Sequence, residues 1–572
     1  MAWLPKTENL RLRRLNLADL GIMLFVISLI VALLLAGRVA PEDVLAQSGP
    51  FNLTGWSLPV DALRSLSRIF IAFLASLLFT IGYGYAAAYT RVGDRILVPL
   101  LDILQSVPVL GFLAASVGGF VLLFGPFWGF EAAAIFAIFT AQAWNMTFAF
   151  YHTLRTLPKD LQEVTSVMRL SRWQRLIHFE LPAAIIPLVL NSMMSFGGSW
   201  FFLAASESFL YQHRTIHLPG IGSYIAVAQQ RGNTAALLAA MAALLLMIVA
   251  VDQLFWRPLV AWSTKFKMGQ VESQEEAPSS FILTTLRRSS LVQSLRERLL
   301  MPVVESLEVH MIRRATTRPP ARREWRLVST VLSFVLIGGT IVFAVLGAAH
   351  VVGSDLGLVP KAIVLGFYTL GRVLAAVGLG ALWTVPVGVW VGMNARALKW
   401  AQPLAQMAAS FPANVLFPLI VVLFIRVGLN LNWGAIPLMM LGTQWYILFN
   451  VMAGAMAIPA DLKEAGKVFG LRGARVWREL ILPAIFPSLI TGGITAAGGA
   501  WNASIVAEVV VWHGKTLAAS GLGALVTEST ASGNTVALLV AIVVMSGFVV
   551  ATNRLLWRPL YRLAETRFHV EE

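Results

Sequence analysis

Four charged residues stand at the edges of long apolar stretches, and they are the first candidates for chemistry in this chain. Glu207 and Glu508 end two apolar runs, and Arg68 and Arg372 begin two others. A charge in such surroundings is costly unless it is paired or functional. We expect two Glu–Arg pairs that shape a gate or line the entrance of a pathway. The alternative for the arginines is that their long side chains reach lipid headgroups.

Several other kinds of site are excluded or poorly supported. The chain has no Cys, which excludes disulfides, thiolate nucleophiles and Cys-based metal sites. Gly514-Lys515-Thr516 resembles the end of a P-loop, but that motif needs glycine at position 509, which is Val509. No nucleophile–base constellation is present, so we expect neither an enzyme nor a bound cofactor. The scattered histidines have no convincing metal-ligand spacing: His152, His178, His213, His217 and His513.

The composition indicates a membrane protein. The 572 residues are 57% hydrophobic and only 13% charged, and several apolar runs approach the roughly 20 residues that a membrane-spanning helix needs. The formal charge of +15 fits basic loops on the cytoplasmic side of a membrane. Nucleic-acid binding is a poor explanation of this charge, because no recognised binding motif accompanies it.

The chain contains an internal duplication. Residues 157–207 and 458–508 align at a constant offset of 301 positions. Earlier in each copy the offset is 304, and there Arg68 aligns with Arg372. A constant offset over fifty residues is typical of an internal repeat. The identical pairs at offset 301 include Pro158/Pro459, Asp160/Asp461, Glu163/Glu464, Leu170/Leu471, Pro182/Pro483, Trp200/Trp501 and Glu207/Glu508.

The apolar runs predict an all-α membrane protein of about twelve transmembrane helices, arranged as two tandem six-helix units. Ser106-Val107-Pro108 predicts a bend in the third run, and Gly125-Pro126 ends that run. The first run follows a basic segment, as a signal peptide would, but we interpret it as a retained span. The predicted spans are 20–35, 67–89, 96–124, 132–151, 183–209, 234–255, 328–348, 370–392, 402–425, 434–454, 484–511 and 535–557.

Five segments follow from this assignment. They are a tail (1–19), a first unit (20–256), a basic linker (257–327), a second unit (328–557) and a second tail (558–572). Within the linker, residues 292–311 have one apolar helical face. This face fits either a helix lying on the membrane surface or an ordinary solvated helix. The basic loops place both termini in the cytoplasm, so the two units form a parallel repeat.

The loops before spans five and eleven resemble the EAA loop of membrane subunits of bacterial binding-protein-dependent ABC importers. The second copy carries Glu464-Ala465-Gly466, then Gly470 and Leu471. The first copy keeps Glu163 and Leu170 but has Arg169 where glycine is usual. The resemblance implies a fold of the type I ABC importer permease and a cytoplasmic coupling helix that docks on an ATPase subunit. It assigns ATPase coupling to Glu163, Arg169, Leu170, Glu464, Ala465, Gly466, Gly470 and Leu471.

A second resemblance concerns the stretches around the two carboxylates. Trp501, Glu508 and Ser520-Gly521-Leu522-Gly523 resemble a pattern of nitrate, sulfonate and taurine permeases, and the first copy keeps Trp200 and Glu207. This similarity implies a small anion such as nitrate, bicarbonate or an organosulfonate. It makes both tryptophans candidates for the pathway or gate. The glycines of spans five and eleven fit either a pathway wall or close helix packing.

Together these features predict the permease subunit of an ATP-driven importer in the bacterial inner membrane. The expected partners are two ABC ATPase subunits, which would carry ATP and Mg, and an external substrate-binding protein. Neither nucleic acid nor a cofactor held by this chain is expected. The alternatives are a fused ferric-iron-type ABC permease and a gradient-driven secondary transporter, in which Glu207 and Glu508 would be proton sites.

Overall fold

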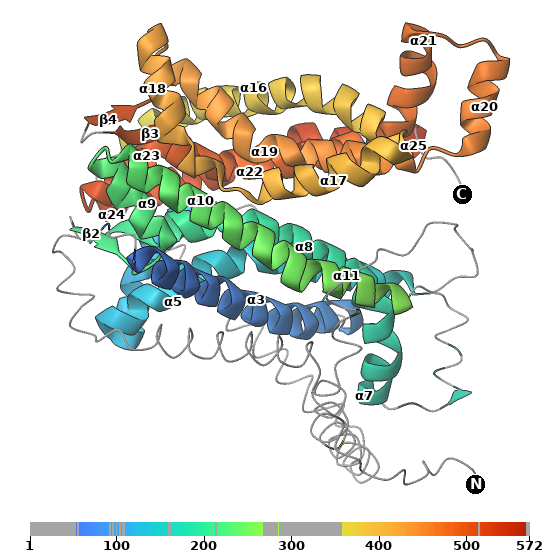
Figure 1. Cartoon of the computed structure of the whole chain (residues 1–572), viewed down its shortest axis with the longest axis horizontal. Helices are drawn as coiled ribbons and strands as arrows, with labels where there is room; N and C mark the ends of the chain where they lie inside the picture. The colour runs from blue at the N-terminus through green and yellow to red at the C-terminus, as the bar shows by residue number, and fades with distance from the viewer. Residues whose placement is uncertain are drawn as a thin grey trace. The chain divides into compact units, whose positions relative to one another are not determined.

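The computed structural model describes residues 56–90, 109–157, 172–211, 214–266, 357–512 and 515–567, with single positions elsewhere (Figure 1). Three predicted features lie outside the described residues: the spans 20–35 and 328–348 and the bend at Ser106-Val107-Pro108. So does nearly all of the amphipathic segment 292–311. What the structure does describe is almost entirely helical, as the apolar runs predict.

The first copy of the repeat is a series of helices with one short hairpin. Its described elements are α3 (Ser57–Tyr89), α5 (Val109–Thr156), α7 (Arg172–Arg175), the π-helical turn η2 (Leu176–Glu180), α8 (Leu181–Ser206), β1 (Ser208–Tyr211), β2 (Arg214–His217), α9 (Ile221–Gln230), α10 (Thr234–Val251), η3 (Asp252–Trp256), α11 (Arg257–Ser263) and η4 (Thr264–Phe266).

The second copy repeats this order, and its hairpin and π-helical turns are displaced by 301 positions from those of the first. Its elements are α16 (Leu358–Gly392), α17 (Ala395–Ser410), η6 (Ala413–Val415), α18 (Phe417–Val427), α19 (Leu431–Met456), α20 (Ala460–Val468), α21 (Ala474–Val476), η7 (Trp477–Ile481), α22 (Leu482–Ala507), β3 (Val509–Trp512), β4 (Lys515–Ala518), α23 (Leu522–Ala531), α24 (Thr535–Thr552), η8 (Asn553–Trp557) and α25 (Arg558–Arg567).

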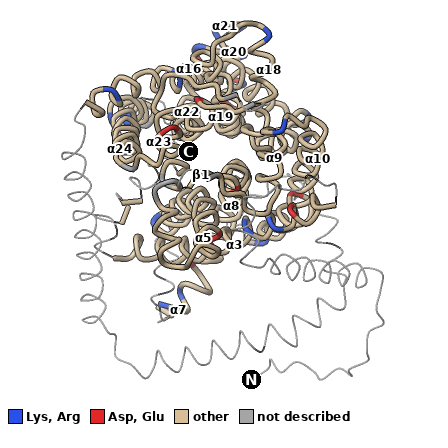
Figure 2. Tube along the Cα trace, turned by 90° about the vertical axis from the view of Figure 1, so that its left-hand side faces the viewer, with Lys and Arg blue, Asp and Glu red and all other residues tan. Residues whose placement is uncertain are grey.

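Eight helical stretches among the described residues are long and apolar enough to cross a membrane. Many large apolar side chains on them are exposed, including Leu78, Leu246, Leu382 and Val543. Figure 2 shows few Lys, Arg, Asp and Glu residues among the other residues of the described chain. Contiguous exposed apolar surface on helices of this length is typical of a lipid-facing surface. The chain is therefore a multi-pass membrane protein. The stretches are Ser57–Tyr89, Ser116–Thr156, Arg172–Ser206, Thr234–Phe266, Leu358–Gly392, Leu431–Met456, Ala474–Ala507 and Val536–Ala564.

Two interruptions follow from single residues. Gly125 adopts a left-handed φ of 75°, so α5 is kinked there and the third apolar run ends as predicted. The segment 402–425, predicted as one span, is interrupted, because α17 ends at Ser410 and α18 begins only at Phe417. Pro412 lies between them. Proline lacks the N–H that a helix interior needs, and it disfavours helical geometry at the preceding residue.

Small residues bring the helices of the second copy together. The core of this copy contains alanines without exposed surface on three helices: Ala362 of α16, Ala435 of α19 and Ala496 of α22. Their small side chains let helix backbones approach closely, which is how helices associate in a membrane.

By its contacts the chain divides into two compact units, and the larger comprises Val39–Tyr151, Asn191–Val249 and Leu332–Glu572. The smaller comprises Met1–Arg38, His152–Leu190 and Ala250–Val331.

Candidate functional site

Both predicted Glu–Arg pairs are present. Arg68 Nη1 lies 2.6 Å from Glu207 Oε1, and Arg372 Nη1 lies 2.7 Å from Glu508 Oε1. The two carboxylates have no exposed surface, while Arg68 is 5% exposed and Arg372 is 7% exposed. The arginines are therefore buried against their partners, and they do not extend to lipid headgroups. Each glutamate directly follows a long helix, α8 or α22, and precedes a hairpin strand.

The two arginines differ in their second partner. Arg68 binds the Glu131 carboxylate with Nε and Nη2, both at 2.6 Å. Arg372 instead donates to the backbone oxygen and the side-chain oxygen of Asn432, both at 2.9 Å. Glu131 and Asn432 are equivalent positions at the offset of 301. The first cluster therefore holds two carboxylates for one guanidinium, whereas the second holds one.

Each buried carboxylate also holds the glycine loop that follows the hairpin. Gly222 N–H donates to Glu207 Oε2 at 2.7 Å, and Ala524 N–H donates to Glu508 Oε2 at 3.2 Å. A hydroxyl completes each cluster: Ser65 donates to Glu207 at 2.6 Å, and Thr369 donates to Glu508 at 2.8 Å. Buried charge is stable only when its hydrogen-bonding capacity is met in this way.

The glycines of these loops make room for the carboxylates. A Cβ on Gly220 would contact the Glu207 carboxylate, and a Cβ on Gly521 would contact the Glu508 carboxylate, in both cases closer than real atoms approach. The motif noticed in the sequence therefore has a packing reason. These contacts favour a structural clamp that fastens the glycine loop to α3 or α16. The role of the pairs as a gate stays a prediction.

The hairpins are short antiparallel pairs of strands that the all-helical prediction did not contain. Ser208 pairs with His217 in the first, and Val509 pairs with Ala518 in the second. Ser208 Oγ lies 3.1 Å from His217 Nδ1, and burial lowers the pKa of His217. The lowered pKa favours the neutral imidazole, and its contact with Ser208 ties the two strands of the hairpin together. In the described part of the chain, no group of three His, Asp or Glu side chains is placed to hold a metal ion.

The two tryptophans predicted for the pathway are core residues. Trp200 is 2% exposed and Trp501 is 1% exposed. The Trp200 ring meets Phe196 edge-on at 5.9 Å, and the Trp501 ring lies 6.2 Å from that of Phe548. Neither tryptophan belongs to the lining of the cavity described below. Their position supports packing of α8 and α22, and a role in the pathway stays a prediction.

The second EAA-like loop is a short helix with a specific end. α20 contains Glu464, which is exposed, and Gly466, which is buried. Leu471 N–H donates to Gly466 O at 2.9 Å, and Gly470 N–H donates to Lys467 O at 3.0 Å. Gly470 has a φ of 68°. This is a Schellman C-cap, which needs a left-handed residue and so explains the glycine of the motif.

The first EAA-like loop is described only at single positions, and Arg169 lies outside them. Glu163 is helical and exposed, as Glu464 is. Leu170 N–H donates to Thr165 O at 3.2 Å. This hydrogen bond is equivalent to that between Leu471 and Gly466. The sequence places Arg169 where a left-handed glycine ends the second loop, a conformation that costs a side-chain residue about 1–2 kcal/mol.

Both loops expose two adjacent apolar side chains at the same place. Val167 and Val468 are 82% and 83% exposed, and Met168 and Phe469 are 66% and 80% exposed. The residues of each pair are 301 positions apart. We call these four residues the loop-tip pairs. Sequence reasoning assigned coupling to the acidic and small residues of the motif and missed these apolar neighbours. The repeat itself gives the signal that would find them.

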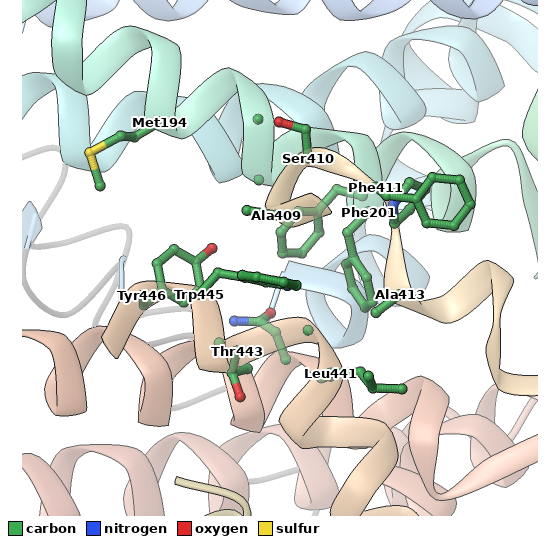
Figure 3. A pocket seen from close by; sticks show the side chains of 18 of the residues that line it. Met194, Phe201, Ala409, Ser410, Phe411, Ala413, Leu441, Thr443, Trp445 and Tyr446 are labelled. Atoms are coloured by element: carbon green, nitrogen blue, oxygen red, sulfur yellow. The ribbon is translucent and has the colours of Figure 1, made fainter. Parts of the chain in front are cut away.

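A cavity of about 70 Å³ opens within the larger compact unit (Figure 3). Three pairs of repeat-equivalent positions on α8 and α22 contribute to its wall: Gly198/Gly499, Phe201/Asn502 and Phe202/Ala503. The rest of the wall comes from α17, α19 and the break between α17 and α18, with Met194 and Gly197 of α8. No Asp, Glu, Lys or Arg is among its lining residues. Sequence reasoning identified the glycines of α8 and α22, but not the polar side chains that face them.

Two glycines of α22, Gly492 and Gly493, serve helix packing, which is one of the two roles that the sequence left open. A Cβ on Gly492 would meet the α19 backbone at Ile447 at 3.0 Å, and one on Gly493 would meet the Trp557 ring at 2.9 Å. Gly197, Gly198 and Gly499 do line the cavity. The glycine-rich segments therefore include both kinds of residue that the sequence left open.

A known protein family matches both copies of the repeat. The family of binding-protein-dependent transport system inner membrane components matches residues 69–255 and 384–557. The bicarbonate transport system permease protein CmpB of Synechococcus elongatus is 29% identical over 160 residues, which are 28% of this chain and 54% of that protein. The chain spans about half the length of several curated relatives it matches.

Two further relatives carry the names of other anions. The nitrate import permease protein NrtB of Synechocystis is 24% identical over 176 residues, 29% of this chain and 62% of that protein. The protein named 'Putative aliphatic sulfonates transport permease protein SsuC' of Escherichia coli is 27% identical over 230 residues. That match covers 36% of this chain and 83% of that protein. The family matches more than half of the 572 residues, once in each copy. The chain is therefore a member of the binding-protein-dependent transport system inner membrane components, with two family units in tandem.

Proposed function

We propose that this chain is the permease subunit of an ATP-driven importer and that it forms the translocation path for a small anion. The observation that carries the proposal is the double family match at 69–255 and 384–557, together with a loop-tip pair in each copy. One chain would thereby supply both membrane units, 20–256 and 328–557, joined by the basic linker 257–327.

The anion class comes from the names of the relatives. The relatives are named for bicarbonate, nitrate and aliphatic sulfonates. These solutes share a small size, a negative charge and oxygen atoms that accept hydrogen bonds.

The partners would be two ABC ATPase subunits and an external substrate-binding protein. Each ATPase would receive one loop-tip pair, because exposed apolar side chains at the tip of a polar helix fit a groove on a partner. ATP and Mg would be bound by these subunits and not by this chain. The protein would lie in a bacterial inner membrane with both termini in the cytoplasm, where its basic loops belong.

The mechanism would be alternating access. Closure of the ATPases on ATP would displace the coupling helix α20 and its counterpart near Glu163. η2 and η7 continue directly into α8 and α22, so a displacement at these loops would pass into the helices that line the cavity. The clamped Glu–Arg clusters at the far ends of those helices would move with them as rigid pieces.

Co-purification tests this proposal. The tagged chain would be isolated from native membranes in mild detergent, and its partners would be identified by mass spectrometry. An ABC ATPase in about twofold molar amount is expected. The chain recovered without an ATPase, with uptake in vesicles driven by a proton gradient alone, would contradict the proposal and support the secondary transporter.

A further inference from the structure

The cavity contains polar side chains that no other part of the described structure uses. Ser410, Gln406 and Tyr446 line it, and none of the three side chains has a hydrogen bond within the described residues. Two other polar side chains of the wall, those of Asn502 and Thr443, are engaged. Asn502 accepts from Val109 N–H at 2.7 Å and donates to Gly498 O at 3.2 Å, and Thr443 donates to Met439 O at 3.0 Å.

Two glycines of α8 leave space beside these polar side chains because they have no side chain of their own. A Cβ on Gly197 would lie 3.0 Å from Ser410 Oγ and 3.5 Å from Gln406 Nε2, and a Cβ on Gly198 would lie 3.1 Å from Tyr446 Oη. Both hydroxyls therefore approach bare backbone, where any side chain would fill the space. Figure 3 shows Ser410 and Tyr446 on opposite sides of the cavity, with the aromatic side chains of Phe201 and Trp445 beside them.

The two copies of the repeat contribute different side chains to the cavity, and the hydrogen-bond donors come from the second copy. Asn502 is equivalent to Phe201, and both line the cavity. Ser410, Gln406 and Tyr446 all belong to the second copy, whereas the first copy contributes Met194, glycines and phenylalanines. A solute in the cavity would therefore find hydrogen-bond donors on one wall and an apolar surface on the other.

We propose that this cavity is a transient binding site for a small oxyanion, held by the hydroxyls of Ser410 and Tyr446 and the amide N–H of Gln406. The inference rests on the proposed import function and adds the place of binding. Hydroxyl and amide groups donate to oxyanions, and the lining offers no carboxylate to a cation. The lining also offers no fixed positive charge, so that binding is weak enough for the solute to leave.

The absence of Cys from the chain allows a direct test. Ser410→Cys would be expressed with the native partners, and its modification by a charged methanethiosulfonate would be timed in membrane vesicles during ATP turnover. Nitrate, bicarbonate and methanesulfonate would be compared with gluconate at equal ionic strength. Ser76→Cys is the matched control, because Ser76 has no exposed surface and bonds Ala72 O at 2.8 Å.

We expect Ser410→Cys to react, Ser76→Cys to remain unmodified, and one of the three anions to slow the reaction at position 410 about tenfold or more. Adding Tyr446→Phe removes one donor, and it should raise the anion concentration needed for protection roughly tenfold. An unreactive Ser410→Cys, equal rates in all anions, or protection unchanged by Tyr446→Phe would overturn the inference. With ATP-driven uptake intact, those outcomes would leave the proposed function standing. Wild-type vesicles without ATP-driven uptake of any of these anions would overturn the proposed function itself.

Discussion

Arg372 and Glu508 form a buried ion pair at 2.7 Å, 136 positions apart in the chain, and Arg68 and Glu207 repeat it at 2.6 Å in the other copy. Each pair joins an early helix of its unit to the end of a later one. Because each glutamate also binds backbone N–H groups of the glycine loop, the pair determines where that loop lies. The pairs are thus anchors of the two family units.

Removal of one partner is expected to destabilise the chain strongly. Arg372→Ala leaves the Glu508 carboxylate buried without its guanidinium, which costs about 3–5 kcal/mol. The double variant Arg372→Met, Glu508→Gln should lose less than the sum of the single changes. Thermal unfolding of the purified protein in detergent measures both, and additive losses would argue against coupling between the two residues.

Exchange of the two charges is not expected to restore the pair. An arginine at position 508 would face the donors of Thr369 and Ala524, which bind the Glu508 carboxylate at 2.8 and 3.2 Å. Two groups of donors would then meet with no acceptor between them. Full recovery of stability and uptake in the Arg372→Glu, Glu508→Arg variant would mean that these hydrogen bonds matter little.

Alanine in the glycine loop is expected to displace the carboxylate. Gly521→Ala places a methyl group against Glu508, and overpacking of this kind costs about 1–3 kcal/mol or more. Gly378 in α16 is the matched control, because nothing lies within 4 Å of the position its Cβ would take. Gly378→Ala should be neutral or stabilising, since alanine favours a helix. Equal melting temperatures for both variants would contradict the clamp.

The loop-tip pairs are expected to hold the ATPase unequally. Phe469→Ala removes an exposed aromatic anchor, and it should weaken ATPase retention on the purified chain roughly tenfold or more. Met168→Ala should weaken it less. Leu555→Ala alters a side chain that is also 80% exposed but outside the loops, and it should have no effect. If Phe469→Ala retained the ATPase as well as the unchanged chain does, the loop tip would not be part of the interface.

The repeat, the helical membrane fold and both ion pairs could be predicted from the sequence. Apolar runs set the helices, and a charge at the edge of an apolar run requires a partner. Glu131 could have been found as a lone carboxylate beside an apolar run. Its equivalent in the second copy is the uncharged Asn432, so comparison of the two copies did not mark Glu131 as a partner of Arg68. The backbone oxygen of Asn432 is an acceptor that sequence cannot reveal, because any residue supplies one.

The cavity was beyond prediction for a different reason. Ser410 and Tyr446 face bare backbone only because Gly197 and Gly198 lie opposite them in the folded chain, more than two hundred positions away. Glycine in an apolar helix signals close approach, whether by another helix or by a solute. Only the packed structure distinguishes Gly198, beside a hydroxyl, from Gly493, beside the Trp557 ring.

Uptake by membrane vesicles containing the chain and its native partners tests the central claim most directly. Nitrate, bicarbonate and an alkanesulfonate would each be offered with ATP and Mg inside the vesicle, with and without a proton gradient. We expect uptake of one of them to require ATP and to be abolished by Glu464→Arg or Gly470→Arg. Glu163→Arg should reduce it less, because the second loop has a glycine-capped helix end at Gly470, where the sequence of the first loop has Arg169. Uptake that follows the proton gradient and ignores Glu464→Arg would contradict the importer.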